Sequence, residues 1–263
     1  MTKLQEICEY MEQFAPQVLA EDWDNVGLLA GDGEAKVKRV MTCLTITPAS
    51  AKEAIEQEAD LIVTHHPLPF RALKRITTDS TPGRLLWELI GQGIAIYSPH
   101  TAFDSASSGI NQRLAEGLAL RDVVPLVAVD GAPDGTGSGR RGQLDRPASL
   151  QDLADRLQQF LRIKHLQYVG RPVTAIQQVA VACGAAGEFL VPACEAGCEL
   201  LVLGETNLHT CLEAEARGIA LLLPGHYASE RFAVEMLADE LGHRFGQVET
   251  WASKAEADPL RWT

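Results

Sequence analysis

Apolar residues in the first quarter of the chain follow a helical spacing first and a strand-like spacing afterwards. Residues 3–20 predict an amphipathic helix, because apolar side chains recur there at the spacing of one helical face. The β-branched, apolar run at 40–46 predicts a strand, 49–57 predicts a helix, and 60–64 predicts a second strand. Continuous apolar strands that alternate with helices are typical of a parallel sheet covered on both faces. The pattern therefore predicts an α/β fold.

The same order of elements occurs a second time along the chain. The strand that opens at Val40 and the strand over 61–63 resemble the strand that opens at Val179 and the one over 200–202. Both pairs lie 139 residues apart. Such self-similarity at a fixed spacing is the pattern that a duplicated unit leaves in a sequence.

A third match explains how the two copies differ in length. Gly-Ile-Ala at 93–95 recurs at 218–220, a spacing of 125 residues, and the shortfall of 14 equals the stretch 70–83. We interpret that stretch as an extra loop of the first copy. The chain is accordingly divided into a first α/β half at 1–129, a glycine-rich connecting loop at 130–142 and a second α/β half at 143–263.

Composition and charge narrow the class of protein. The 263 residues are 46% hydrophobic and 22% charged, which is the balance of a globular protein with a real core. The net charge of -12 disfavours non-specific binding to nucleic acid, because the phosphate backbone would be repelled. We expect a cytoplasmic protein without membrane association, since no apolar run reaches the roughly 20 residues of a membrane span and the N-terminus has no signal pattern.

Two adjacent histidines follow one of the predicted strands. His65 and His66 come directly after the apolar run 61–64 and before Pro67, at the end of a strand where α/β proteins place their ligands. A polar turn without chemistry would give the same residues. Because neighbouring side chains diverge from an extended backbone, we expect the two imidazoles to serve two different metal ions or none.

Two pairs of histidine and carboxylate follow the third strand of each half. His100 and Asp104 follow the strand at 94–97, and His226 and Glu230 follow the one at 221–223. A spacing of four residues places both side chains on one helical face, which could also be a solvated face without function. Together with His65-His66, the two pairs offer imidazole and carboxylate ligands for a mixed nitrogen and oxygen metal site.

The remaining polar motifs are weaker. His209 follows another strand and could face a substrate or cap a helix, whereas Arg140 and Arg141 in the glycine-rich loop could hold an anion or lie in solvent. We find neither a phosphate-binding glycine motif nor a G-x-S-x-G turn.

These motifs occur in an order that resembles a known family, the Ngg1-interacting-factor-three-like proteins, which are often labelled GTP cyclohydrolase 1 type 2 homologs. The matching segments run from residue 23 to residue 230 and are Trp23-Asp24-Asn25-Val26-Gly27-Leu28, His65-His66-Pro67-Leu68, His100-Thr101 with Asp104, residues 137–142, Gly204-Glu205 with His209, and Gly225-His226-Tyr227 with Glu230. Three departures are Leu44-Thr45-Ile46 where an acidic residue is common, Ala185-Ala186 in place of serine, and Leu203 in place of threonine.

The resemblance implies a three-layer α/β/α protomer of two related halves, a toroidal homohexamer and a dinuclear metal centre. By motif position, the metal ligands fall on His65, His66, Asp104, His226 and Glu230. His100 and His209 would lie nearby as candidates for proton transfer. We expect two divalent ions per chain, with Zn, Fe and Mn all compatible with these ligands.

Two classes of function fit this expectation. The first is a metal-dependent hydrolase acting through metal-activated water on a nucleotide-like or other small substrate. The alternative is a non-enzymatic metal carrier or a scaffold that presents the ions to a partner. Regulation by nucleotide binding is disfavoured, because no phosphate loop is found.

Overall fold

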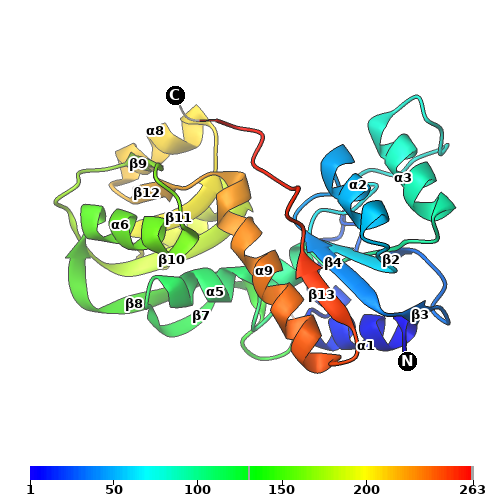
Figure 1. Ribbon diagram of the computed structural model, residues 1–263. Helices are drawn as coiled ribbons and strands as arrows, with labels where there is room; N and C mark the ends of the chain where they lie inside the picture. The colour runs from blue at the N-terminus through cyan, green and yellow to red at the C-terminus, as the bar shows by residue number, and fades with distance from the viewer. Residues whose placement is uncertain (130, 262–263) are drawn as a thin grey trace. The chain divides into compact units, whose positions relative to one another are not determined.

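The computed structural model describes residues 1–129 and 131–261, and it divides into two compact units. Unit 1 comprises 1–103 and 233–259, and unit 2 comprises 104–232 with the last residues from 260. These bounds differ from the predicted halves, whose division rests on internal similarity and stays a prediction in that sense. Asp130, which opens the predicted connecting loop, lies outside the described residues. Figure 1 shows the elements of each unit.

Unit 1 is built on a five-stranded sheet in the order β13-β4-β5-β6-β2. Its first four strands are parallel, and β2 pairs with β6 in the antiparallel sense. The strands are β2 (Gly27–Ala30), β4 (Arg39–Cys43), β5 (Leu61–Thr64), β6 (Ala95–Ser98) and β13 (Glu249–Ala252), and a separate ribbon is formed by β1 (Thr2–Lys3) and β3 (Lys36–Val37).

Helices cover both faces of this sheet. The helical elements are α1 (Leu4–Phe14), η1 (Gln17–Leu19), α2 (Pro48–Glu56), α3 (Thr81–Gly91) and the later part of α9 (His226–Arg244). Helices α2 and α3 bury Ala54 and Leu89 against Met41 and Ile62 of the strands. On the other face the Thr42 hydroxyl donates to the Val234 carbonyl of α9 at 2.7 Å.

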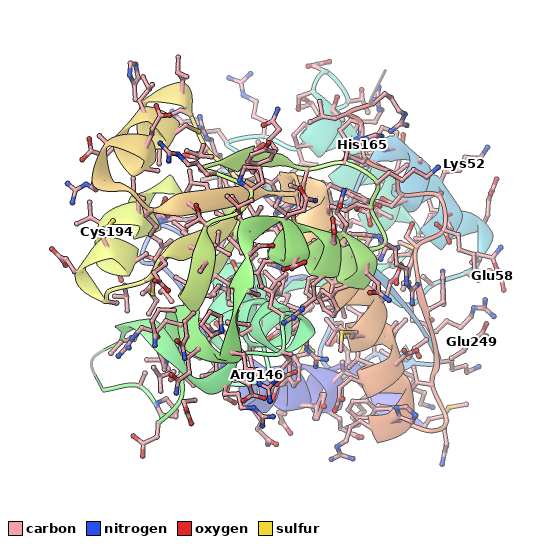
Figure 2. The ribbon with its side chains drawn as sticks, turned by 90° about the vertical axis from the view of Figure 1, so that its left-hand side faces the viewer. Lys52, Glu58, Arg146, His165, Cys194 and Glu249 are labelled. Atoms are coloured by element: carbon pink, nitrogen blue, oxygen red, sulfur yellow. The ribbon has the colours of Figure 1, made fainter. Side chains whose placement is uncertain are left out.

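The solvent side of these helices is charged, as their amphipathic pattern requires. Figure 2 shows the side chains of Lys52 and Glu58 on the outer side of α2 and of the turn that follows it. Helix α2 begins with a capping box between Thr47 and Ser50, which satisfies backbone N–H groups that the helix itself leaves unpaired.

Unit 2 contains a six-stranded sheet in the order β7-β8-β10-β11-β12-β9. Its strands are β7 (Arg121–Ala128), β8 (Gly137–Ser149), β9 (Gln167–Val169), β10 (Ala175–Ala185), β11 (Leu200–Glu205) and β12 (Ala220–Leu223). Among the described strands of this sheet, parallel pairing between neighbours occurs only within β10, β11 and β12, and the other neighbours pair in the antiparallel sense. The helical elements are α5 (Ile110–Gly117), α6 (Leu150–Leu161), η2 (Gly187–Phe189), α7 (Leu190–Glu195) and α8 (Leu208–Arg217).

The strand registers of the two sheets agree residue by residue with the sequence match. In unit 1, Val40 pairs with Leu61 and Leu61 with Ala95. In unit 2, Val179 pairs with Leu200 and Leu200 with Ala220. The predicted α/β fold of two related parts is confirmed, since each sheet has the same parallel core with helices on both faces.

The predicted connecting loop needs a correction. Residues 137–142 form the first part of β8, which pairs with β7 and β10, so Gly137, Gly139 and Gly142 lie in a strand rather than in a solvated loop. Gly139 has a φ of +63°, a conformation that residues with a side chain rarely adopt. Arg140 is fully buried and Arg141 is exposed.

Arg140 is neither an anion site nor a solvated side chain, the two alternatives left open by the sequence. Its guanidinium donates to the carbonyls of Gly135, Gly137, Gly139, Ser105 and Ala106. The burial lowers the pKa of Arg140 to about 10, which still leaves it protonated at neutral pH. The side chain therefore ties the end of α4 (His100–Ser105) to the start of β8.

No helix in the described ranges is long and apolar enough to cross a membrane.

Candidate functional site

Three histidines of unit 1 gather at the carboxyl ends of β5 and β6. His65 and His66 follow β5 and His100 follows β6, and these strands are parallel neighbours. Their ring centroids lie 5.0 Å apart for His65 and His66, 5.1 Å for His65 and His100, and 5.5 Å for His66 and His100. One ligand atom from each lies within 4.8 Å of the others. This group, named the imidazole set, could hold a metal ion.

The expectation that His65 and His66 diverge was wrong. Strand β5 ends at Thr64, so the two histidines lie in a bend rather than on an extended backbone. The bend is fixed by the Thr64 hydroxyl, which donates to the His66 carbonyl at 3.0 Å. The argument that two neighbouring imidazoles require two ions therefore fails, and the number of ions has to rest on other grounds.

Two of these imidazoles are oriented through their Nδ1 atoms. His66 Nδ1 lies 2.7 Å from the Thr45 hydroxyl, and His100 Nδ1 lies 2.7 Å from a carboxylate oxygen of Asp24. An oxygen partner on Nδ1 turns Nε2 toward the other side, which is the arrangement usual for metal-binding histidines. Thr45 belongs to the segment Leu44-Thr45-Ile46 that departs from the resembled pattern, and its hydroxyl keeps a hydrogen bond to the histidine.

Asp24 serves His100 as an ionised carboxylate. Its side chain is only 1% exposed. Burial would raise its pKa, but hydrogen bonds from His100 and from the hydroxyl and backbone N–H of Thr101 outweigh burial and lower the pKa to about 2. His100 itself has a φ of +26°, so its backbone is held in a conformation unusual for a residue with a side chain.

Unit 2 carries a second set of donors, named the carboxylate set and made of Asp104, His226 and Glu230. His226 opens α9, and the four-residue spacing brings its Nε2 to 3.2 Å from a Glu230 oxygen, as the sequence predicted. His226 Nδ1 lies 3.0 Å from a Glu205 oxygen at the end of β11. Glu230 is 3% exposed, so its carboxylate is buried within the unit.

Charge in the carboxylate set favours a cation. The hydrogen bond to Glu230 raises the pKa of His226 to about 9, and Glu205 adds to the effect. The Cys183 thiol donates to Asp104 at 3.1 Å, and burial followed by the charges of Asp104 and Glu230 raises the pKa of that thiol well above its usual value. Asp104 and Glu230 both lie near the Cys183 thiol, and Glu205 and Glu230 both contact His226, so this part of the unit is rich in carboxylates, the donors that a divalent cation prefers.

The backbone leaves room for the Glu230 carboxylate at one glycine. Gly184 in β10 has a φ of +68°, and a Cβ at this position would collide with Oε1 of Glu230. The Ser229 hydroxyl accepts from the Gly184 N–H at 3.0 Å and donates to the His226 carbonyl at 2.8 Å. The donors present therefore fit a divalent cation in charge and in type.

The two histidines predicted to be catalytic differ in burial. His100 is 7% exposed within the imidazole set. His209 is exposed on the first turn of α8, and its role stays a prediction. Sequence reasoning assigned no role to Asp24, Thr45 or Glu205, although Asp24 and Glu205 stand inside the motifs that carried the resemblance.

Comparisons with known proteins agree with the resemblance. The chain is 32% identical over 264 residues to a Clostridium acetobutylicum protein named GTP cyclohydrolase 1 type 2 homolog, which covers 99% of this chain and 98% of that protein. It is 34% identical over 263 residues to NIF3-like protein 1 of Drosophila melanogaster, which covers 98% of this chain and 88% of that protein.

Solved structures share the fold. Reduced HcgD from Methanocaldococcus jannaschii superposes with a TM-score of 0.84 at 26% identity, over 96% of this chain and 98% of that one. A Staphylococcus aureus protein superposes with a TM-score of 0.89 at 23% identity, over 100% of this chain and 99% of that one. The family model described as Duf34/NIF3 (NGG1p interacting factor 3) matches residues 2–259. This chain belongs to the Duf34/NIF3 family.

Proposed function

We propose that the protein is a metal-dependent hydrolase that binds divalent cations through His65 and His66 of the imidazole set and through the carboxylate set. The observation that carries the proposal is the orientation of His66 and His226: their Nδ1 atoms are engaged by Thr45 and Glu205, so Nε2 points to the other side of each ring, at His226 toward the Glu230 carboxylate. The names of relatives such as the Clostridium acetobutylicum protein support a nucleotide-like substrate.

The proposed ligands are those predicted from the sequence, His65 and His66 in unit 1 and Asp104, His226 and Glu230 in unit 2. Two donor sets favour two ions per chain. That both ions share one dinuclear centre stays a prediction. A bound divalent cation supplies a water molecule of lowered pKa and stabilises negative charge that develops in the reaction.

In the proposed hydrolysis, His100 and Asp24 handle the proton of the attacking water. His100 is fixed by the Asp24 carboxylate at Nδ1, so its Nε2 can accept a proton from water and return it to a leaving group. Asp24 keeps the imidazole in one tautomer and stabilises the imidazolium that forms, as the carboxylate does in other histidine–carboxylate pairs. His209 is the second candidate for this role.

Metal content and turnover test the proposal. We expect anaerobically purified protein to contain divalent metal by elemental analysis and to hydrolyse GTP or another nucleotide only when metal is bound. His66→Ala should lose metal and turnover, while His165→Ala, the substitution of an exposed histidine outside both sets, should change neither. Metal binding without turnover on any substrate tried would favour a metal carrier, and a metal content far below one per chain after reconstitution would reject both functions.

A ring-shaped homohexamer is part of the proposal and rests on the resemblance. Light scattering in moderate salt should give a mass several times that of the 28.5 kDa chain. A mass that stays at one chain over a range of protein concentrations would reject the hexamer.

A further inference from the structure

A hollow of about 660 Å³ lies beside the imidazole set and is formed by unit 1 alone. It is lined by Trp23, Asp24, Asn25, Phe70, Arg71 and Ala72. The volume falls in the range of about 300–1,000 Å³ that small-ligand sites occupy. The lining comes from two loops, one before β2 and one after β5.

Two aromatic rings at this hollow are exposed. The side chain of Trp23 is 62% exposed and that of Phe70 is 50% exposed, and their ring centroids lie 6.0 Å apart with the planes tilted by 45°. Exposing large aromatic side chains to water is unfavourable. Two neighbouring exposed rings at the edge of a hollow are therefore typical of a binding site. Flat ligands with a π face stack on such rings.

The two loops are fixed to each other and to the site. The Asn25 side-chain amide donates to the Pro69 carbonyl at 2.9 Å, which joins the Trp23 loop to the Phe70 loop. Asp24, between Trp23 and Asn25, is held by His100. The rings are therefore presented by a backbone already in place, so a ligand need not order it.

The same rings contact the proposed proton carrier. The His100 ring centroid lies 5.9 Å from that of Trp23 and 5.7 Å from that of Phe70, in edge-on arrangements. Because His100 also belongs to the imidazole set, a flat ligand seated on Trp23 and Phe70 would lie next to both the metal donors and the proton carrier.

Charge on the Phe70 loop favours an anion, whereas the Asp24 carboxylate that also lines the hollow is buried against His100 and Thr101. Arg71 lines it, and Lys74 and Arg75 follow within the same loop, all three exposed. The segment 65–78 contains no carboxylate, although the chain as a whole carries a net charge of -12. A cationic segment in such a chain is suited to attract a phosphate group.

We propose that the Trp23–Phe70–Arg71 hollow binds a nucleotide, with the heteroaromatic base on the two rings and the phosphate at Arg71. The inference rests on the proposed function for the reaction done to that ligand, but the binding can be measured separately. It makes Trp23 and Phe70 specificity-determining residues and assigns the phosphate to Arg71.

Three probes separate the parts of the ligand. Binding of GMP, guanosine and ribose 5-phosphate to the full-length protein is measured by calorimetry, with and without added Mn²⁺. Trp23→Leu should weaken the binding of GMP and guanosine by about 10-fold or more and leave the binding of ribose 5-phosphate unchanged, because only the stacking of the base is affected. Arg71→Gln should weaken the binding of GMP and ribose 5-phosphate and leave the binding of guanosine unchanged, because guanosine has no phosphate.

Trp87→Leu is the matched control, since Trp87 is 63% exposed on α3 and does not line the hollow. It should bind all three probes as the wild type does. The proposal is overturned if the wild type binds no GMP, if Trp23→Leu binds it normally, or if Trp87→Leu loses as much. The circular dichroism spectrum and the metal content of each variant should match those of the wild type. If the wild-type protein binds no metal, the proposed hydrolase is rejected, while the nucleotide-binding result stands on its own.

Discussion

Substitution of Gly184 by alanine is expected to remove metal from the carboxylate set by displacing one side chain. The new Cβ would collide with Oε1 of Glu230 and would stand 3.6 Å from Nε2 of His226. Glu230 is buried, so its carboxylate has to shift inside the unit to avoid the new Cβ, and the shift disturbs its 3.2 Å contact with His226. Moving a ligand or its direct partner typically weakens metal binding by about 10- to 100-fold.

Gly197→Ala separates this effect from backbone strain. Gly197 has a φ of +73°, close to the +68° of Gly184, but a Cβ there meets no atom within 4 Å. Both variants place alanine in the left-handed region, which costs about 1–2 kcal/mol of folding free energy. The two should therefore lose similar stability from strain, and only Gly184→Ala should lose metal affinity and the additional free energy of the collision.

The assay has two parts. Urea unfolding of chelator-treated protein measures stability, and calorimetric titration with Zn²⁺ or Mn²⁺ measures metal affinity. If Gly184→Ala and Gly197→Ala bind metal equally well, either Glu230 is no ligand or its carboxylate moves without loss, and the reasoning from this glycine is refuted.

Three further predictions concern the hydrogen bonds of single residues. Arg140→Met should lower the free energy of unfolding in urea by about 3–5 kcal/mol, because several buried carbonyls lose a charged donor, whereas Arg141→Met on the exposed neighbouring side chain should change it little. Thr45→Val should weaken metal binding in calorimetry by about 10-fold, because His66 loses the partner that orients it. The Tm difference between wild type and Glu53→Gln should shrink as the pH falls below 4.5, the ordinary pKa of a glutamate. Burial would raise the pKa of Glu53, but hydrogen bonds from the 253–255 segment lower it. The ionised carboxylate therefore stabilises the folded state above pH 4.5, and this stabilisation is lost on acidification.

Each of these has a result that would contradict it. Equal stability of Arg140→Met and Arg141→Met would mean that water replaces the guanidinium. Unchanged affinity in Thr45→Val would mean that His66 needs no partner at Nδ1. A Tm difference for Glu53→Gln that stays constant between pH 7 and pH 3 would mean that the Glu53 charge does not stabilise the fold.

The sequence by itself determined the parallel strands at the core of each sheet and the similarity between the two sets of strands. The spacing of 139 residues between Val40 and Val179 reappears as identical strand pairing, because buried strands with apolar side chains on both faces have one register that keeps those side chains in the core. The histidines and carboxylates were found for the same reason, since they stand where apolar strands end and the chain turns.

Only the tertiary structure decided what orients these residues. Thr45 and His66, Asp24 and His100, and Glu205 and His226 are far apart in sequence, and no local pattern predicts that they meet. The bend at His65-His66 and the burial of Arg140 were missed because a strand's end and a side chain's exposure are set by the packing of neighbouring elements. Periodicity reports which face of an element is buried, whereas hydrogen bonds between distant segments depend on how loops close over the sheet, which no short window of sequence contains.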